Sequence, residues 1–165
     1  MRLTVYTDYA LRLMMYLAVK NNGLATIAEI ADSFDISKNH LMKVAHQLGV
    51  AGYIETVRGR SGGLRLAKSP KSIILGEVVR RTEPDMALVP CFKPVDAFCV
   101  IRPNCALRGA LHRAQAAFVK VLDDYSLNDL VQPRSQLQAL LSIKADGSAP
   151  PGGRARKQNK VGARA

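Results

Sequence analysis

The sequence lacks the motifs by which most enzymes are recognised. It contains no C-x-x-C pair, no phosphate-binding loop, no paired-carboxylate site and no Ser/His/Asp arrangement, which argues against a thiol oxidoreductase or a cluster carrier acting as an enzyme. The three histidines, His40, His46 and His112, are scattered along predicted helices, where a surface or packing role is more common than catalysis. We therefore expect a protein that is not an enzyme.

Long apolar runs are also missing. The N-terminal stretch MRLTVYTDYALRLMMYLAV resembles a signal peptide at first sight, but Asp8 and Arg12 interrupt it. The uninterrupted apolar run from Leu13 to Val19 is too short for a signal peptide or a membrane span. The sequence therefore predicts a cytoplasmic protein with no membrane partner. In such a reducing compartment, cysteines serve metal binding or redox chemistry more often than disulfides.

Acidic residues are few, with 13 Asp and Glu against 24 Lys and Arg, so the formal net charge is +11. Such an excess favours a polyanionic partner such as nucleic acid, and a role in solubility alone is the alternative. Residues 146–165 hold one large apolar side chain and are predicted to form a disordered basic tail. The five cations and one acid of this tail account for +4, which leaves +7 for the rest of the chain.

Two helices are predicted near the N-terminus. Apolar residues recur at helical spacing over residues 4–19, where Thr7 is the expected N-cap and Asp8 lies in the first turn. After a break at Asn-Asn-Gly, Thr26 and Glu29 form a T-x-x-E capping box that opens a short second helix. Both helices belong to a predicted domain over residues 1–82.

A third helix and a β-hairpin follow in the same domain. Ser37 is the expected cap of a helix over residues 38–52, whose first turn is polar and basic. Strands over 54–57 and 64–66 flank the glycine-rich, basic tip RGRSGG. This order predicts a winged helix-turn-helix within a fold that is mainly α with a small β-hairpin. The expected DNA-binding residues are Ser37, Lys38, Asn39, His40, Lys43, Arg58 and Arg60.

The second half of the chain holds a helix that suits dimerisation. A helix beginning near Ser72 closes the first domain, a cysteine-containing loop covers residues 83–106, and a helical segment covers 107–145. That segment opens with apolar residues spaced by 4, 3, 4 and 3, which is a heptad seam. Pairing with a second helix and packing onto the chain's own domain both explain the seam. Its members are Leu107, Leu111, Ala114, Phe118 and Val121.

All three cysteines fall within residues 91–105, spaced as C-x7-C-x5-C. Zinc sites usually bring cysteines in C-x2-4-C pairs, so structural zinc is disfavoured. Three thiolates on one loop suit an iron-sulfur cluster whose fourth ligand comes from elsewhere. Cys105 lies directly before the long helix, where the helix dipole, Arg102 and Arg108 favour a thiolate. Redox thiols without metal, or three incidental cysteines, are the alternatives.

With these elements in hand, the chain resembles the iron-sulfur winged-helix repressors, and among them the nitric-oxide-sensing NsrR branch. The resemblance runs from MRLTVYTDYALR through KNHLMKVAHQLGVAGYIETVRGRSGGLRLAK and LGEVVRRTEP to YSLNDLV, about 130 residues in all. It implies a homodimer on an inverted-repeat DNA operator, with one cluster per subunit bound by Cys91, Cys99 and Cys105 and by Asp8 of the partner. It favours [4Fe-4S] over [2Fe-2S] and implies that nitric oxide destroys the cluster and relieves repression.

Two neighbouring branches of the family differ at identifiable positions. The interval from Cys91 to Cys99 is similar to that of the iron regulator RirA, which leaves iron as an alternative signal. The KNHLMK segment and Asp8 resemble the NsrR branch instead. The IscR relatives place a histidine ligand three positions after the third cysteine, where this chain has Arg108, so ligation of that type is disfavoured. A metal-free redox regulator is the remaining alternative.

Overall fold

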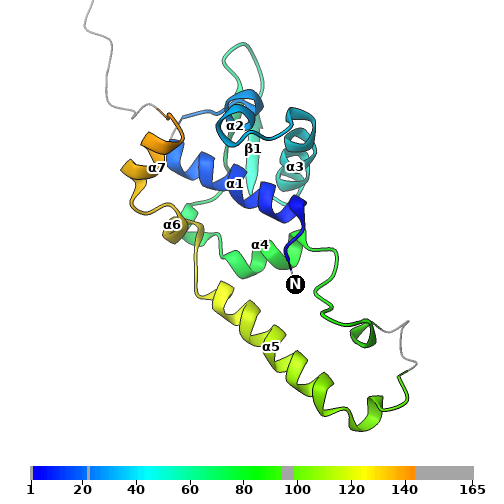
Figure 1. The fold of residues 1–165 in the computed structure, drawn as a ribbon. Helices are drawn as coiled ribbons and strands as arrows, with labels where there is room; N and C mark the ends of the chain where they lie inside the picture. Colours follow the sequence, from blue (N-terminus) through cyan, green and yellow to red (C-terminus); the bar gives the residue numbers. More distant parts are fainter. Residues whose placement is uncertain (1, 22, 94–98, 144–165) are drawn as a thin grey trace, which may run out of the picture.

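The computed structural model describes residues 2–21, 23–93 and 99–143. The predicted basic tail lies outside the described residues, as does the part of the cysteine loop over 94–98. Figure 1 shows the elements in chain order. They are α1 (Val5–Lys20), α2 (Ile27–Phe34), α3 (Lys38–Val50), β1 (Ile54–Val57), β2 (Gly63–Leu66), α4 (Leu75–Thr82), α5 (Ala106–Asp123), α6 (Leu127–Leu130) and α7 (Arg134–Leu140), with short 3-10 helices at Pro70–Ser72, Pro90–Phe92 and Arg102–Asn104.

The fold is mainly helical with one antiparallel hairpin, as the sequence predicts. In the hairpin Ile54 lies opposite Leu66, and Val57 lies opposite Gly63. A two-stranded hairpin is marginal in water by itself. Here Ala25 and Leu64 exchange backbone hydrogen bonds of 3.0 and 2.8 Å, which tie the hairpin to the segment before α2. The buried side chain of Leu64 then joins the core of the helices.

Helix α1 is the centre of the hydrophobic core. It contacts α2, α3, α4, α6, α7 and β2, so one helix organises elements from both halves of the chain. Leu13 and Met14 are fully buried, and they share the core with Ile30 of α2 and Leu41 of α3. A fully buried apolar side chain of this size contributes roughly 1.5–3 kcal/mol relative to an exposed one. The position of α3 is therefore fixed by its packing on α1.

Two predicted helix starts and one predicted capping bond differ from the structure. Thr4 is the N-cap of α1, whereas Thr7 is buried inside the helix and donates its backbone N–H to the Thr4 hydroxyl at 3.3 Å. Ser37 occupies the N-cap position of α3, but its side chain makes no capping hydrogen bond. Helix α4 begins at Leu75 instead of near Ser72, because the preceding Ile74 pairs in extended form with Ser126. The Thr26–Glu29 capping box is confirmed in both directions.

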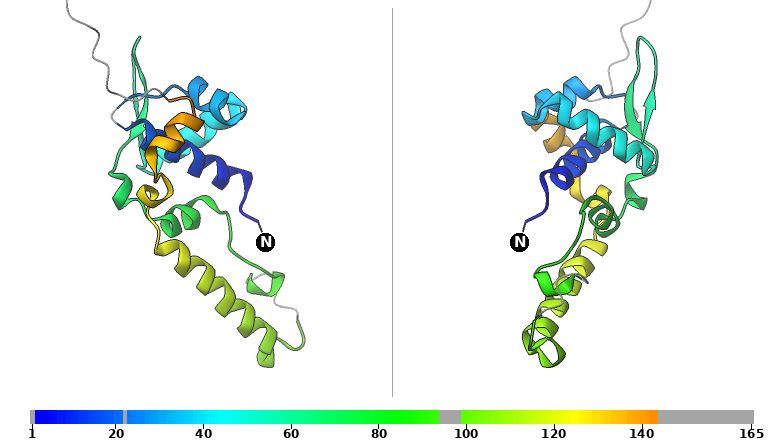
Figure 2. Two further views of the ribbon diagram at one scale, coloured as in Figure 1. Left: turned by 60° about the vertical axis from the view of Figure 1, so that its left-hand side comes forward. Right: turned by 90° about the vertical axis from the view of Figure 1, so that its right-hand side faces the viewer.

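Helix α5 projects away from the other helices. Figures 1 and 2 show it as an arm below the domain, attached at its C-terminal end beside α4. No residue of α5 is buried within the chain, and two seam residues, Leu107 and Val121, are 65% and 56% exposed. Packing onto its own domain therefore leaves these two seam residues uncovered.

After α5 the chain returns to the first domain. Leu127 and Val131 are fully buried in the core around α1, and Ile143 is nearly so. Leu127 donates its backbone N–H to the Ile73 carbonyl at 2.8 Å, and Leu75 donates to the Tyr125 carbonyl at 2.9 Å. The arm is therefore bracketed by two segments of one core. Among the described residues, no helix has both the length and the apolar character needed to cross a membrane.

Candidate nucleic-acid interface and cysteine arm

The polar face of α3 is open to solvent at all predicted DNA-contacting positions. The opposite face is anchored in the core by Leu41, Val44 and Leu48. A helix held by one face and polar on the other can enter a major groove without losing its own packing. The five predicted residues on or beside this helix, all exposed, are Ser37, Lys38, Asn39, His40 and Lys43.

His40 also contacts the first turns of α1. The rings of His40 and Tyr9 lie 6.4 Å apart between centroids. They line an apolar hollow of about 350 Å³ together with Val5, Tyr6, Lys43 and Val44. The N-terminal end of the predicted reading helix is thus in direct contact with the helix that carries Asp8. Sequence spacing within either helix did not indicate this contact.

The tip of the hairpin presents two arginines. Arg58 and Arg60 are exposed, and within the described part of the chain no ion pair neutralises either of them. By contrast, Arg65 on the same hairpin pairs with Glu55 at 3.2 Å. Gly59, which lies between Arg58 and Arg60, has φ of +117°, a backbone angle that residues with a side chain rarely adopt. The tip therefore carries free cations on a turn that requires glycine.

Cys91, Cys99 and Cys105 are all free thiols. Cys105 is the N-cap of α5, and its Sγ accepts the backbone N–H of Arg108 at 3.4 Å. The prediction that Cys105 directly precedes the long helix is therefore confirmed. Cys99 is exposed, whereas Cys91 and Cys105 are partly covered. Three unpaired thiols on one loop are a donor set that suits an iron-sulfur cluster.

The segment that carries Cys91 is folded onto α5. Phe92 stacks on His112 with ring centroids 4.3 Å apart and planes inclined by 26°. The side-chain amide of Gln115 donates a hydrogen bond to the Met86 carbonyl. Asp85 pairs with Lys93 at 2.9 Å, and the hydrogen bonds it accepts from Lys93 and the Ala87 backbone hold the pKa of Asp85 below its ordinary value.

Asp8 lies in the first turn of α1 and forms an ion pair with Arg12 at 2.9 Å. This is the i, i+4 pairing of a helix surface. Among the described residues, no three His, Cys, Asp or Glu side chains come close enough together to hold a metal ion. Within one subunit, Asp8 and the cysteines therefore do not assemble a site, and Asp8 stays a predicted ligand from a partner.

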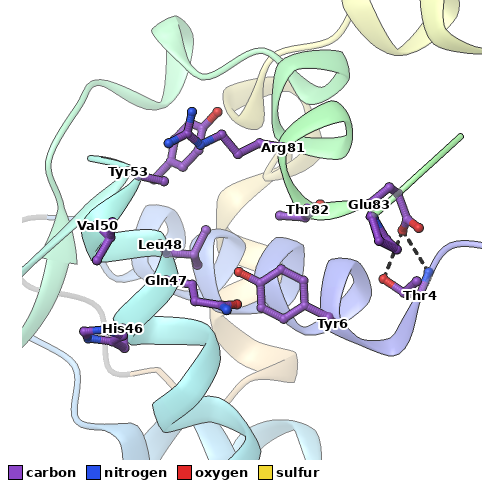
Figure 3. Close-up of a pocket in the computed structure, with 12 residues that line it drawn as sticks. Thr4, Tyr6, His46, Gln47, Leu48, Val50, Tyr53, Arg81, Thr82 and Glu83 are labelled. Carbon is purple, nitrogen blue, oxygen red and sulfur yellow. Dashed lines mark hydrogen bonds between the residues drawn. The ribbon is translucent and has the colours of Figure 1, made fainter.

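A polar network joins the end of α4 to the start of α1. Glu83 accepts hydrogen bonds from the backbone N–H and the hydroxyl of Thr4, at 2.8 and 3.1 Å. The buried Thr7 hydroxyl donates to Thr82 at 2.8 Å. Thr4, Tyr6 and Glu83 line a hollow of about 780 Å³, and Figure 3 shows the hydrogen bonds between Thr4 and Glu83. Burial raises the pKa of Tyr6. In the sequence, this network is visible only as polar side chains at its members' positions, namely Thr4 and Thr7 near the N-terminus and the dipeptide Thr82-Glu83.

Helices α4 and α5 meet through an ion pair and a glycine. The two terminal nitrogens of Arg80, Nη2 and Nη1, donate to the Asp123 carboxylate at 2.7 and 3.1 Å. A Cβ on Gly76 would collide with Oδ1 of Asp123. The close approach of the two helices therefore depends on glycine at position 76, and the arm leaves the domain in one defined direction.

Comparisons with known proteins show which family this chain belongs to. The model of the Rrf2 family, described as iron-dependent transcriptional regulators, matches residues 3–133. The HTH-type transcriptional regulator NsrR of Bacillus licheniformis is 50% identical over 143 residues, which is 86% of this chain and 100% of that protein. The NsrR of Bacillus subtilis is 49% identical over 145 residues, which is 87% of this chain and 99% of that protein.

Solved structures give the same fold. The global cysteine regulator CymR of B. subtilis has a TM-score of 0.67 at 27% identity, covering 79% of this chain and 95% of that one. IscR of T. potens has a TM-score of 0.63 at 23% identity, covering 89% of this chain and 94% of that one. The second likeness bears on the fold alone.

Proposed function

This chain belongs to the Rrf2 family of transcriptional regulators, and from this premise we propose that it represses its target genes until nitric oxide reaches an iron-sulfur cluster. The chain is a DNA-binding transcriptional regulator and not an enzyme. Its sequence resemblance to the NsrR branch is confirmed by relatives at about half identity over most of the chain. The signal, the cluster and the dimer are the proposed parts.

The proposal of sequence-specific DNA binding rests on the exposed face of α3. Asn39 offers an amide for base edges, while Lys38 and Lys43 offer cations for base edges or phosphates. Arg58 and Arg60 on the wing reach an adjacent minor groove or its phosphates. A dimer reads an inverted repeat whose half-sites are spaced by whole turns of DNA, about 34 Å or a multiple.

Exposure of the α5 seam supports a homodimer. Leu107 and Val121 leave large apolar surfaces in solvent within a single chain. The length of α5, 18 residues, corresponds to roughly 27 Å of helix. An apolar stripe of this length on an unpartnered helix is the pattern by which helices pair. Two such arms packed together would place two α3 helices on opposite half-sites.

The residues that would hold the cluster are Cys91, Cys99 and Cys105, with Asp8 from the partner. Thiolates are the usual ligands of [4Fe-4S] and [2Fe-2S] clusters, of which we favour [4Fe-4S]. When bound, the cluster supplies an iron atom that is accessible to nitric oxide. A carboxylate is a harder ligand than a thiolate and binds such iron more weakly, so Asp8 would leave its iron the most accessible.

Two structural connections would carry the signal from the arm to α3. Glu83, the first residue of the cysteine loop, is hydrogen-bonded to Thr4 at the start of α1. Helix α1 in turn packs on α3. Arg80 and Asp123 fix α5 to α4. Because these contacts are short and direct, displacement of the loop would shift α1 and α3 together and take the two reading helices out of register.

Purification without oxygen tests the proposal directly. The wild-type chain should be brown, absorb visible light and contain iron, whereas Cys99→Ser should be colourless and release a target operator. Ser135→Ala, exposed on α7 and away from both proposed sites, is the control and should be brown and bind the operator like the wild type. A colourless, iron-poor wild-type chain that still binds its operator with full selectivity would contradict the proposal.

The spacing of the first two cysteines favours one second candidate. The interval from Cys91 to Cys99 is similar to that of iron-responsive relatives of the RirA type. Titrating nitric oxide, and separately an iron chelator, against operator binding distinguishes the two signals. Release by nitric oxide at constant iron supports nitric oxide sensing. Release by the chelator alone supports iron sensing, and insensitivity of a metal-free chain to both leaves the thiol redox switch.

A further inference from the structure

We propose that His112 is a positioning residue, which holds Cys91 against α5 through its stack with Phe92. The role of Cys91 as a cluster ligand rests on the function proposed above, but the positioning itself does not. Nothing in the spacing of the cysteines indicates this contact, because His112 lies on the helix that follows the loop.

The stack lies outside the hydrophobic core. His112 is exposed, Phe92 is partly covered, and no residue of α5 is buried within the chain. The centroid distance of 4.3 Å and the interplanar angle of 26° describe rings that overlap face to face. Aromatic pairs at such distances attract beyond the area that they bury. Phe92 directly follows Cys91 in the turn Pro90–Phe92, so fixing the Phe92 ring fixes the position of the Cys91 backbone.

A second contact holds the same segment one turn further along the helix. Gln115 lies three residues after His112, so both side chains project from neighbouring positions on α5. The Gln115 amide donates to the Met86 carbonyl. Asp85 and Lys93 lie immediately outside these two contact points, and their ion pair closes the segment. The Cys91 segment is therefore attached to α5 at two points and is compact between them.

The same helix also fixes Cys105. Cys105 is the N-cap of α5 and accepts the Arg108 backbone N–H. His112 follows seven residues later, which is about two turns of helix and nearly the same face. Helix α5 thus sets the positions of two cysteines, one through its N-cap and one through His112. Ordering Cys91 before ligation removes part of the entropy that cluster binding would otherwise cost.

Thiol reactivity in the metal-free protein tests the positioning. The rate of alkylation at each cysteine is measured by peptide mass spectrometry in wild type, His112→Ala, His112→Phe and Arg113→Ala. Cys91 should react about three- to tenfold faster in His112→Ala, because loss of the stack frees a partly covered thiol. His112→Phe should keep the slow rate of the wild type, because a phenyl ring can stack on Phe92 in place of the imidazole. The exposed neighbour Arg113 should have no effect when removed.

The cluster-loaded protein provides a second measurement. His112→Ala should release iron to a chelator faster than wild type, and His112→Phe should not. Equal alkylation of Cys91 in wild type and His112→Ala would overturn the positioning role. A uniform increase at all three cysteines would also overturn it, because that result indicates general loosening. If the wild type binds no cluster, the proposed function fails while the alkylation rates still decide the role of His112.

Discussion

Glu83 caps the first helix of the protein from 79 positions away, accepting both the backbone N–H and the hydroxyl of Thr4 through one carboxylate oxygen. Thr4 in turn accepts the backbone N–H of Thr7, so the free N–H groups at the start of α1 are satisfied partly by a residue at the end of α4. The first turn of α1 therefore exists in this form only in the folded chain. Any change that moves Glu83 moves the helix that carries Asp8.

Glu83→Ala should lower the free energy of unfolding by about 1–3 kcal/mol, since it leaves the Thr4 donors without their partner. Glu83→Gln keeps an acceptor oxygen in the same place and should cost less, which makes it the matched control. Urea unfolding followed by circular dichroism measures both. Equal stability of wild type and Glu83→Ala would show that water replaces the carboxylate at no cost.

Asp123→Asn should destabilise the chain at neutral pH, and the difference should disappear in acid. The hydrogen bonds from Arg80 hold the pKa of Asp123 below its ordinary value of 3.8. A carboxyl whose pKa is lowered by folding stabilises the fold above that ordinary value, and the contribution is lost as the pH falls through the folded pKa. Unfolding measured from pH 7 down to pH 2, which extends well below the ordinary pKa of 3.8, tests this. The adjacent exposed Asp124, changed to Asn, is the control.

Gly76→Ala should lower the free energy of unfolding by about 1–3 kcal/mol, as overpacking between helices usually does. The added methyl group would collide with the Asp123 carboxylate and displace it from its place between α4 and α5. Gly109→Ala on α5 is the control, because its Cβ would come no closer than 3.8 Å to the Arg113 side chain. Alanine is the better helix former, so this control should stabilise the chain by up to about 1 kcal/mol. Thermal unfolding of both variants decides the sign.

Arg60→Ala should weaken DNA binding on every sequence and reduce the slope of log affinity against log salt by about one unit. Arg58 and Arg60 at the hairpin tip form no ion pair among the described residues, so their full charge is available to phosphates. Arg65→Ala removes an arginine that is already paired with Glu55 and should change the slope less. Fluorescence anisotropy at several salt concentrations measures both. An unchanged slope for Arg60→Ala would count against a phosphate contact.

Asn39→Ala should instead relax sequence preference, with a loss of about 1–3 kcal/mol of discrimination at one base pair of the half-site. Gln47→Ala, exposed further along the same helix, is the control. Binding to a set of operators with single base changes provides the measurement. An equal loss of affinity on all sequences would mean that Asn39 contacts the backbone and does not read a base.

Local patterns predicted the exposed, polar face of α3 because that face depends on one helix and one turn. The Thr26–Glu29 box, the buried stripe of α3 and the basic glycine-rich tip are each contained within a few neighbouring residues. The first N-cap was wrongly assigned to Thr7, because two threonines three positions apart offer the same local signal. The choice between them is made by Glu83, which local sequence does not indicate.

The cysteine loop and helix α5 were predicted only in part, because their contacts also depend on residues that are distant in the sequence. The position of Cys105 before α5 follows from sequence order. The stack of Phe92 on His112 and the collision that keeps position 76 a glycine arise between segments that meet only after folding. The start of α4 was misplaced because Ile74 pairs with Ser126, more than fifty residues later in the chain. Such pairings leave no periodic pattern in either segment.

The chain leaves the domain through α4 and re-enters it through α6, so the long arm is an insertion into a single core. Leu127 and Val131 complete that core after the arm has ended. An insertion of this kind can lengthen, shorten or change its chemistry over evolutionary time while the host keeps every internal contact. One host domain can thus be combined with many different arms, each built between the same two attachment points.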